Sequence, residues 1–481
     1  MLRKPDLLPC EDAVTPLSPP RLVLELPPDQ AFLPTAAAAA ENAAQVFGLD
    51  RGDALRLALA VEEYFTYLCR FAGREEPIRL TLTQGGTFAR ASFRFRAGEV
   101  SLRALNFAAS VDLDGADGEA GGEAAELGLL VASRTTDRSS LELSGADVYQ
   151  LCAEVDRSYP VGQPVTSPQH LSPPLGIEET PGAGLLQHGA LLAAGRYPAR
   201  LCPQCFQRPA RFADMVASDQ YRALVALDNS GHPAGLLCWR ASGRRGVVFS
   251  GPYVFAEPAQ AALGADTARL LTERFLSLVA RSEAVCAFSE RPTRDLPKGW
   301  FERLGTLLLP GQDDSGQNSL GQDDSPAPAE QPAFFRHLRE DVGGAVWAHP
   351  ELMPFLQREY SRLAFSRDLL AAAPQAQSQL PAHSLLATAL DRRRGMVVLR
   401  PLLDGRDFSA NLAAHVAALN TQADESADDP ALAILLHLDL SEPWQAARYP
   451  ALVENGFTPR LILPHGGNSD ILVCQHVHSP R

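Results

Sequence analysis

Long apolar runs are missing from this sequence. No uninterrupted apolar stretch reaches the roughly 18 residues that a membrane-spanning helix requires. The first residues, MLRKPDLLPCEDAV, lack the apolar core of a signal peptide. We therefore expect no membrane span and a cytoplasmic location.

Basic charge is also in short supply. Lys and Arg total 43 against 57 Asp and Glu, which gives a net charge of −14, and no basic block occurs. Nucleic acids and anionic membranes attract basic surfaces. The charge balance therefore predicts neither of them as a partner.

Cysteine is too sparse for a disulfide framework, with 8 residues in a chain of 481. Cys202 and Cys205 form a single CxxC in the stretch LCPQC. A zinc ribbon needs a second pair at suitable spacing, and none occurs. Thioredoxin-like chemistry needs a preceding strand, which GRYPAR does not resemble. We predict no metal site and favour two incidental thiols, with a redox or metal role as the open alternative.

Composition and hydrophobic periodicity divide the chain into three structured segments and three connecting ones. The stretch GQDDSGQNSLGQDDSPAPAEQP cannot bury a core, so we predict that it is a disordered linker. The predicted boundaries are a tail at 1–20, a first domain at 21–157, a Pro-rich linker at 158–174, a second domain at 175–310, the disordered linker at 311–332 and a third, shorter domain at 333–481.

The first domain is predicted to be an α+β sandwich. A strand at 21–28 is followed by two helices and three alternating strands, then by an acidic, Gly-rich loop, a helix that opens at LGLLVASRTTDRSSLEL and a closing strand. This order predicts one antiparallel sheet with helices on one face. The second and third domains repeat a similar αβ pattern, so they are predicted to be diverged copies of one unit.

The second predicted helix contains AVEEYFTYLCRFAG, in which Glu63 and Tyr67 lie one turn apart on one face. Residues 21–157 resemble the ATPase domain of anti-sigma-factor serine/threonine kinases, a branch of the histidine-kinase-like ATPases with the Bergerat fold. The resemblance implies ATP and Mg²⁺ as ligands, with Glu63 as the catalytic carboxylate. Tyr67 stands where the family has the Asn that ligates Mg²⁺, and a phenol is a poor ligand for that cation.

The other two ATP-binding motifs of the resemblance are also altered. In LNFAAS, Asn106 replaces the Asp that binds the adenine amino group, and Ala108 replaces the Gly that lets the base approach. In ELGLL, Gly128 survives at the phosphate-binding helix start, while Glu126 replaces a second Gly and adds repulsive charge. We predict a degenerate ATP site. The resemblance further implies a protein partner, a sigma factor or an anti-sigma antagonist, and allows a homodimer.

Residues 175–310 resemble a GNAT acyltransferase, and residues 333–481 a second, shorter one. The resemblance lies in three consecutive strands, a long helix, and WFERLG, which is expected to be helical. It implies acetyl-CoA as cofactor. The pyrophosphate loop would be EPAQAALGADTARLL, in which Gln260 and Gly264 are four apart instead of three. Phe301 stands in place of the Tyr that serves as general acid in the family.

Three functions are compatible with these motifs. The favoured one is a regulatory protein that acts by binding, because catalytic positions are altered in both kinds of domain. The second is an N-acyltransferase that uses acetyl-CoA. The third is a working serine/threonine kinase, which requires Glu63 and Asn106 to suffice without a Mg²⁺-ligating Asn.

Overall fold

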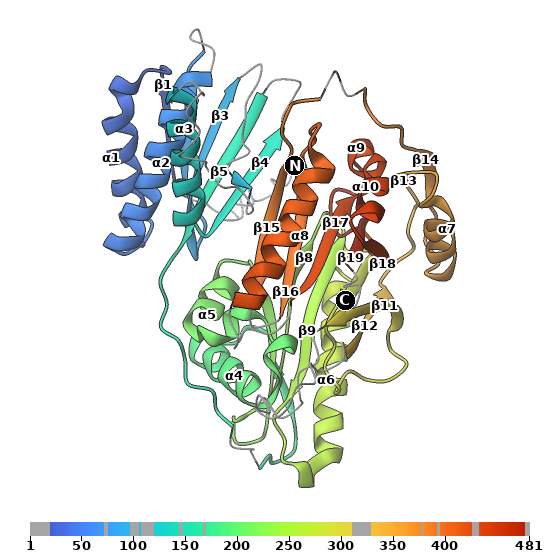
Figure 1. Cartoon of the computed structure of the whole chain (residues 1–481). Coiled ribbons are helices and arrows are strands. Elements are labelled where there is room, and N and C mark those ends of the chain that lie inside the picture. The colour runs from blue at the N-terminus through green and yellow to red at the C-terminus, as the bar shows by residue number, and fades with distance from the viewer. Residues whose placement is uncertain are drawn as a thin grey trace, which may run out of the picture.

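The computed structural model describes residues 20–71, 76–96, 105–106, 120–143, 148–166, 170–309, 329–376, 378, 380–391, 395–425 and 432–476. It has the predicted α+β class. An N-terminal domain, a middle unit and a C-terminal unit each contain a sheet of five or seven strands (Figure 1). No described helix is long and apolar enough to cross a membrane.

The N-terminal domain is a five-stranded antiparallel sheet with three helices on one face (Figure 1). The strand order is β1-β2-β3-β5-β4. Its core is formed by apolar residues of the helices and the inner sheet face. Its elements are β1 (Arg21–Leu26), α1 (Leu33–Val46), α2 (Arg51–Phe71), β2 (Ile78–Gln84), β3 (Phe88–Arg96), α3 (Ala120–Thr135), β4 (Arg138–Leu143) and β5 (Val148–Asp156).

Strand β4 falls inside the stretch from which the sequence predicts a helix. At the end of helix α3 the hydroxyls of Thr135 and Thr136 both donate to the carbonyl of Ala132, and the chain pairs with β5 from Arg138 onward. The predicted strand at 99–109, apart from residues 105–106, lies outside the described residues. Ala108 also lies outside them, so its predicted place beside adenine stays a prediction.

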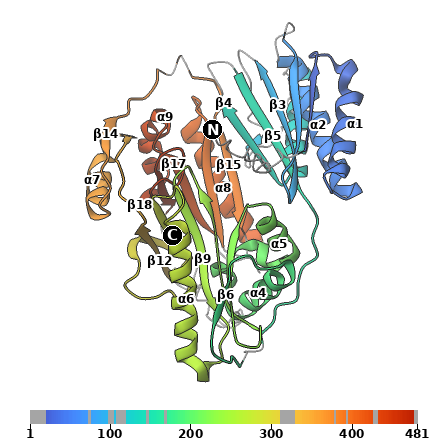
Figure 2. The same cartoon turned by 180° about the vertical axis from the view of Figure 1, so that it is seen from behind.

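The middle unit contains a seven-stranded sheet of order β11-β12-β10-β9-β8-β7-β6, in which β9 and β10 run parallel and the other neighbouring strands run antiparallel. Helices α4 and α5 pack on one face and α6 on the other (Figures 1 and 2). The elements are β6 (Gly176–Glu178), α4 (Ala183–Arg196), α5 (Pro209–Ala217), β7 (Arg222–Leu227), β8 (Pro233–Ser242), β9 (Gly246–Val254), α6 (Ala261–Val279), β10 (Cys286–Ser289), β11 (Glu302–Leu309) and β12 (Ala329–His337).

Two predictions about the end of this unit are wrong. The predicted helix over GWFERLG is instead the entry to strand β11, because Gly299 adopts a φ of +77° and the residues from Glu302 onward pair with β12. Strand β12 begins at Ala329, inside the segment predicted as a linker at 311–332. The sheet of the middle unit therefore continues beyond residue 310.

The C-terminal unit contains a five-stranded sheet of order β15-β16-β17-β19-β18, with β16 and β17 parallel. The order β8-β9-β10-β12-β11 of the middle unit is the same, and α6 and α8 connect the parallel strands in the two units. The elements are β13 (Ala345–Ala348), α7 (Met353–Arg362), β14 (Asp368–Ala371), β15 (Leu385–Asp391), β16 (Met396–Leu403), α8 (Phe408–Glu425), β17 (Ala433–Asp439), α9 (Pro443–Ala447), α10 (Tyr449–Glu454), β18 (Phe457–Leu463) and β19 (Ile471–His476).

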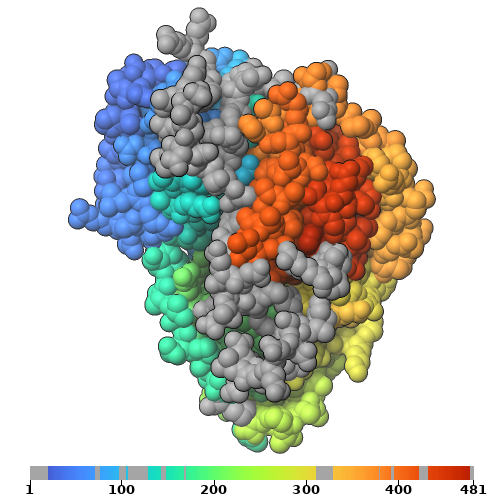
Figure 3. Space-filling view, viewed as in Figure 1, coloured from blue at the N-terminus to red at the C-terminus, as the bar shows by residue number. Residues whose placement is uncertain are grey.

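The middle and C-terminal units share one hydrophobic core, which joins β10–β12 to β16–β19. The amide of Gln475 bonds both main-chain groups of Leu308, at 2.9 and 2.5 Å. Gly305 leaves room for Leu461, whose Cβ would lie 2.5 Å from a Cβ at position 305. In Figure 3 the blue N-terminal domain is on the left of the molecule and the orange and red C-terminal third is on the right.

Candidate functional site

One residue of the altered ATP-binding motifs, Asn106, lies where the N-terminal domain meets the C-terminal unit. Asn106 is buried, at 5% exposure. Its amide nitrogen donates to the carbonyl of Ser384 at 3.0 Å, and its amide oxygen accepts from the N–H of Leu386 at 2.9 Å. Both ends of the side chain are therefore bonded to the start of strand β15.

Glu63, on α2, packs against α3. A Cβ at Gly128 would lie 2.2 Å from the Glu63 carboxylate, so this carboxylate fills the space above the glycine. Burial, followed by the charge of Glu62, raises the pKa of Glu63. Tyr67, one turn further along α2, is 1% exposed and belongs to the domain core. The structure thus brings Glu63 and Gly128 together and gives Tyr67 a packing role. The predicted helix start at Gly128 is wrong, because α3 begins at Ala120 and Gly128 lies inside it.

The predicted acetyl-CoA loop is occupied by the protein's own contacts. The Gln260 side chain accepts from the N–H of Leu171 at 2.8 Å and donates to its carbonyl at 2.7 Å. Gly264 is buried in α6, where a Cβ would lie 3.2 Å from Val254 and 3.6 Å from Ala256. Gln260 therefore holds the Pro-rich linker, and Gly264 allows α6 to approach β9. Phe301 lies against Phe249, with ring centroids 5.0 Å apart.

Strands β9 and β10 pair in parallel over a short stretch, and β9 continues beyond the end of β10. Their pairing ends at Val248 and Phe288, whereas β9 continues to Val254. A strand that continues beyond its partner leaves main-chain groups that an extended ligand can bond. Here the Tyr197 hydroxyl accepts from the N–H of Val254 at 2.6 Å and donates to Asp295 at 2.6 Å.

The Thr293 hydroxyl extends this internal bonding, because it donates to the carbonyl of Pro252 at 2.7 Å. Burial and the charge of Asp295 together raise the pKa of Tyr197 well above its ordinary value. Side chains from outside the strands therefore bond the main-chain groups of β9 beyond its pairing with β10. Nothing in the spacing of Tyr197, Thr293 and Asp295 marks this role in the sequence.

The parallel strands of the C-terminal unit also continue beyond their paired stretch. Pairing of β16 with β17 ends at Leu399 and Leu436. Beyond that point the Gln445 amide accepts from the N–H of Asp439 at 2.8 Å and donates to the carbonyl of Pro401 at 3.2 Å. A side chain from α9 therefore bridges the two strands.

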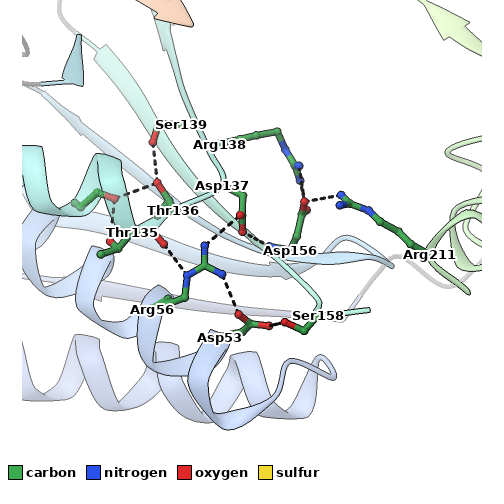
Figure 4. Close-up of polar contacts among 11 residues, drawn as sticks. Asp53, Arg56, Thr135, Thr136, Asp137, Arg138, Ser139, Asp156, Ser158 and Arg211 are labelled. Carbon is green, nitrogen blue, oxygen red and sulfur yellow. Dashed lines mark hydrogen bonds and ion pairs between the residues drawn. The ribbon is translucent and has the colours of Figure 1, made fainter. Parts of the chain in front are cut away.

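A polar cluster lies where the N-terminal domain meets the middle unit (Figure 4). Arg138 bonds both carboxylate oxygens of Asp156, at 3.1 and 2.7 Å, and also bonds Glu154 at 2.6 Å. Arg211, from α5, reaches the same Asp156 at 2.5 Å. Figure 4 shows Arg138 and Arg211 approaching Asp156 from two sides. One carboxylate thus links β4, β5 and α5.

A cavity of about 450 Å³ opens beside this cluster. All three parts of the chain contribute to its wall: β4 and β5, the segment from Pro203 through α5, and Asp391 at the end of β15. Three arginines line it, Arg138, Arg208 and Arg211. They are far apart in the sequence and belong to no motif, so sequence reasoning missed them.

The two cysteines of the CxxC occupy different environments. Cys202 is buried, with its sulfur 3.6 Å from the carbonyl of Ala193. Cys205 is half-buried and lines the cavity. No cluster of three or more His, Cys, Asp or Glu side chains suited to a metal ion occurs among the described residues.

Comparisons with known proteins give distant similarities only. No protein-family model matches the sequence, and no curated protein matches it. Among solved structures, an aminoglycoside 6'-acetyltransferase type Ii is 12% identical, with 34% of this chain and 98% of that chain covered and a TM-score of 0.24.

An acetyltransferase of the GNAT family from Staphylococcus aureus Mu50 is 8% identical, with 34% and 100% covered and a TM-score of 0.24. A spermidine N-acetyltransferase chimera from Vibrio cholerae is 14% identical, with 34% and 95% covered and a TM-score of 0.25. Each of these acetyltransferases aligns with about a third of this chain. Similarity at this level carries no activity over to the chain.

Proposed function

We propose that the protein acts by binding, as a regulatory protein of the anti-sigma-factor-kinase type with a degenerate ATP site. The observation that carries this proposal is the engagement of Asn106. The amide that would meet adenine in the family is bonded to the main chain at Ser384 and Leu386. Because a buried amide that loses both bonds is costly, a nucleotide would have to displace the C-terminal unit to use it.

The packing of Tyr67 supports the same proposal. This side chain is buried in the core, so it offers no ligand for Mg²⁺. The partner is then a protein, and the resemblance suggests a sigma factor or an anti-sigma antagonist. A carboxylate with a raised pKa suits a general base, so Glu63 is the residue on which the kinase alternative depends.

A thermal-shift titration with Mg-ATP tests the proposal. A ligand at 100 times its Kd stabilises the folded protein by roughly 2.7 kcal/mol. We expect no saturable shift and no ATP hydrolysis. Hydrolysis that disappears in Glu63→Ala, but persists in the neighbouring control Glu62→Ala, would overturn the proposal in favour of a kinase or ATPase.

An N-acyltransferase is the second candidate, favoured by one observation. Both sheets contain a central parallel pair, β9/β10 and β16/β17, in which one or both strands continue beyond a short paired stretch. Main-chain groups beyond the pairing suit an extended, amide-rich donor such as acetyl-CoA. The hydroxyl of Tyr197 would have to leave Val254 before a donor could bind there.

An acetyl-CoA titration distinguishes this candidate. A saturable thermal shift together with release of free CoA in the presence of amines would establish acyl transfer. The variant Tyr197→Phe frees the N–H of Val254, so it should strengthen donor binding if β9 forms the donor site. An unchanged response of Tyr197→Phe alongside wild-type acyl transfer would place the donor site elsewhere.

A further inference from the structure

We propose that the cavity beside Asp156 is a binding site for a small phosphorylated polyol, and that its occupation reports on the docking of the N-terminal domain. This inference deepens the proposed function, because a regulatory binding protein needs a signal. The cavity volume of about 450 Å³ lies within the range of small-molecule sites.

The charge of the wall favours an anion. Three arginines and two aspartates line the cavity, a formal sum of 3 − 2 = +1. Asp156 is already bonded by Arg138 and Arg211, so it is largely neutralised. Arg138 directs its guanidinium at Asp156 and Glu154, and one terminal nitrogen of Arg211 is bonded to Asp156. Arg208 and the Nε of Arg211 remain for a ligand.

Two arginines of the cavity wall have guanidinium nitrogens without a protein partner among the described residues. Among the described residues, the Nε of Arg211 is buried without a hydrogen-bond partner. Arg208 is exposed and forms no ion pair within the described part of the chain. These two guanidinium groups come from the start of α5, whose first turn has no side-chain cap. Guanidinium forks and an uncapped helix start both favour a phosphate group.

The remaining wall is suited to hydroxyl groups. Asp391, Gln204 and Gln207 add a carboxylate and two amides to the lining. A carboxylate accepts hydrogen bonds from ligand hydroxyls but repels a second anionic group. A phosphate monoester of a small polyol can place its phosphate at the arginines and its hydroxyls at Asp391. A ligand with an anionic group at each end would place one of them beside the Asp391 carboxylate.

The position of the cavity gives binding a structural consequence. Its wall is made jointly by the N-terminal domain, the middle unit and the C-terminal unit. A ligand that contacts all three binds the docked arrangement better than an undocked one, so it shifts the population toward docking. Surfaces of the N-terminal domain that a partner protein uses would then respond to the ligand.

Calorimetric titration of the full chain at fixed ionic strength tests the site. The probes are glucose 6-phosphate, inorganic phosphate and glucose. We expect saturable binding of glucose 6-phosphate, weaker binding of phosphate and none of glucose. No saturable binding of either phosphate probe up to millimolar concentration, or equal binding of glucose, would overturn the proposal.

Two variants locate the binding. Arg208→Gln removes an exposed guanidinium, so the fold should persist and affinity for glucose 6-phosphate should fall at least about tenfold. Arg222→Gln is the matched control, because this arginine is 68% exposed on β7 and pairs only with Asp219 among the described residues. Equal loss of affinity in the two variants would contradict a site at Arg208.

Cysteine alkylation supplies an independent readout. Cys205 lines the cavity, whereas the similarly half-buried Cys69 lies on α2. Glucose 6-phosphate should slow alkylation of Cys205 and leave that of Cys69 unchanged, as measured by peptide mass spectrometry. Unchanged rates at both cysteines in the presence of bound ligand would place the ligand elsewhere.

The same variants separate this inference from the proposed function. A thermal shift with Mg-ATP that disappears in Arg208→Gln comes from phosphate binding in the cavity. A shift that persists in Arg208→Gln, with hydrolysis that depends on Glu63, overturns the proposed function and leaves the cavity site standing. If the phosphate probes show no binding and Mg-ATP gives no thermal shift, the cavity site is overturned and the proposed function stands.

Discussion

The middle and C-terminal units share a strand order but differ at one edge. In the middle unit the sheet continues past β8 through β7 to β6. In the C-terminal unit it stops at β15, and the N-terminal domain covers the start of that strand through Asn106. Leu385 of β15 is part of the N-terminal domain's core. The same fold can therefore protect an edge with its own strands or with a neighbouring domain.

The two units also differ in the polar groups that they bury. In the middle unit, the hydroxyls of Tyr197 and Thr293 form the bridge beyond the pairing of β9 with β10. The C-terminal unit uses the amide of Gln445 for its bridge, and it additionally buries an ion-pair network around Arg367. Substitutions at these positions test whether the two units depend on different interactions for stability.

The largest effect is expected for Arg367→Met. Arg367 is 2% exposed and pairs with Asp341 at 2.6 Å and with Asp470 at 2.7 Å. Removal of the cation leaves two buried carboxylates uncompensated, which should cost about 3–5 kcal/mol in urea-induced unfolding. Arg358→Met, on an exposed part of α7, is the control and should change the free energy of unfolding little. A small effect of Arg367→Met would show that this network does not distinguish the two units.

The bridges beyond the paired stretches should have smaller and similar effects. Tyr197→Phe leaves the N–H of Val254 unbonded, and Gln445→Leu leaves that of Asp439 unbonded. Each should destabilise the protein by about 1–3 kcal/mol in urea-induced unfolding. The double variant should lose the sum of the two, since the bridges belong to different sheets. If the loss of unfolding free energy in the double variant differs from the sum of the two single losses, the two bridges are coupled.

Asn106→Ala should loosen the docking of the N-terminal domain. Loss of its two bonds leaves the carbonyl of Ser384 and the N–H of Leu386 with fewer partners, at about 1–3 kcal/mol. Scanning calorimetry should then resolve an earlier transition for the N-terminal domain. Asn411→Ala is the control, because Asn411 bonds the same Ser384 carbonyl from α8, within the C-terminal unit. Identical calorimetric profiles for the two variants would contradict a docking role for Asn106.

The smallest effect is a pH dependence confined to the C-terminal unit. Burial lowers the pKa of His415 on α8, which is 0% exposed, whereas α6 carries no histidine. The unfolded chain therefore binds a proton that the folded chain does not, and stability falls as pH drops below about 6.5. His415→Leu should reduce this slope without abolishing it, because burial also lowers the pKa of His437 on β17, to about 3. A slope that is unchanged in the variant would assign it to another group.

The sequence predicted the α+β class and most strands that alternate cleanly. The stretches that became β2, β3, β7, β8 and β9 all have the alternating or continuous apolar pattern of strands. Residues 299–305 resembled a helix because of a family motif, yet the positive φ of Gly299 and pairing with β12 made them strand. Long-range pairing decided that outcome, and local pattern carries no record of it.

The candidate sites divide in the same way. Glu63 and Gly128 belong to two separate motifs of the resemblance, and the structure places them close together. The partner of Asn106 lies 278 residues further along the chain, so no local pattern could identify it. The cavity arginines Arg138, Arg208 and Arg211 come from two domains and meet only after docking. Sites assembled between domains are therefore the part that sequence reasoning misses.

The edge of β15 that the N-terminal domain covers has a consequence for any shortened form of this protein. A chain that begins at residue 170 would keep both tandem units but lose the domain that bonds Ser384 and Leu386. The main-chain groups at that edge would then be a template for strand addition by other copies. Self-association of such a fragment into oligomers or aggregates, at concentrations where the full chain stays dispersed, is the expected behaviour. The N-terminal domain would in that sense be a built-in guard against aggregation.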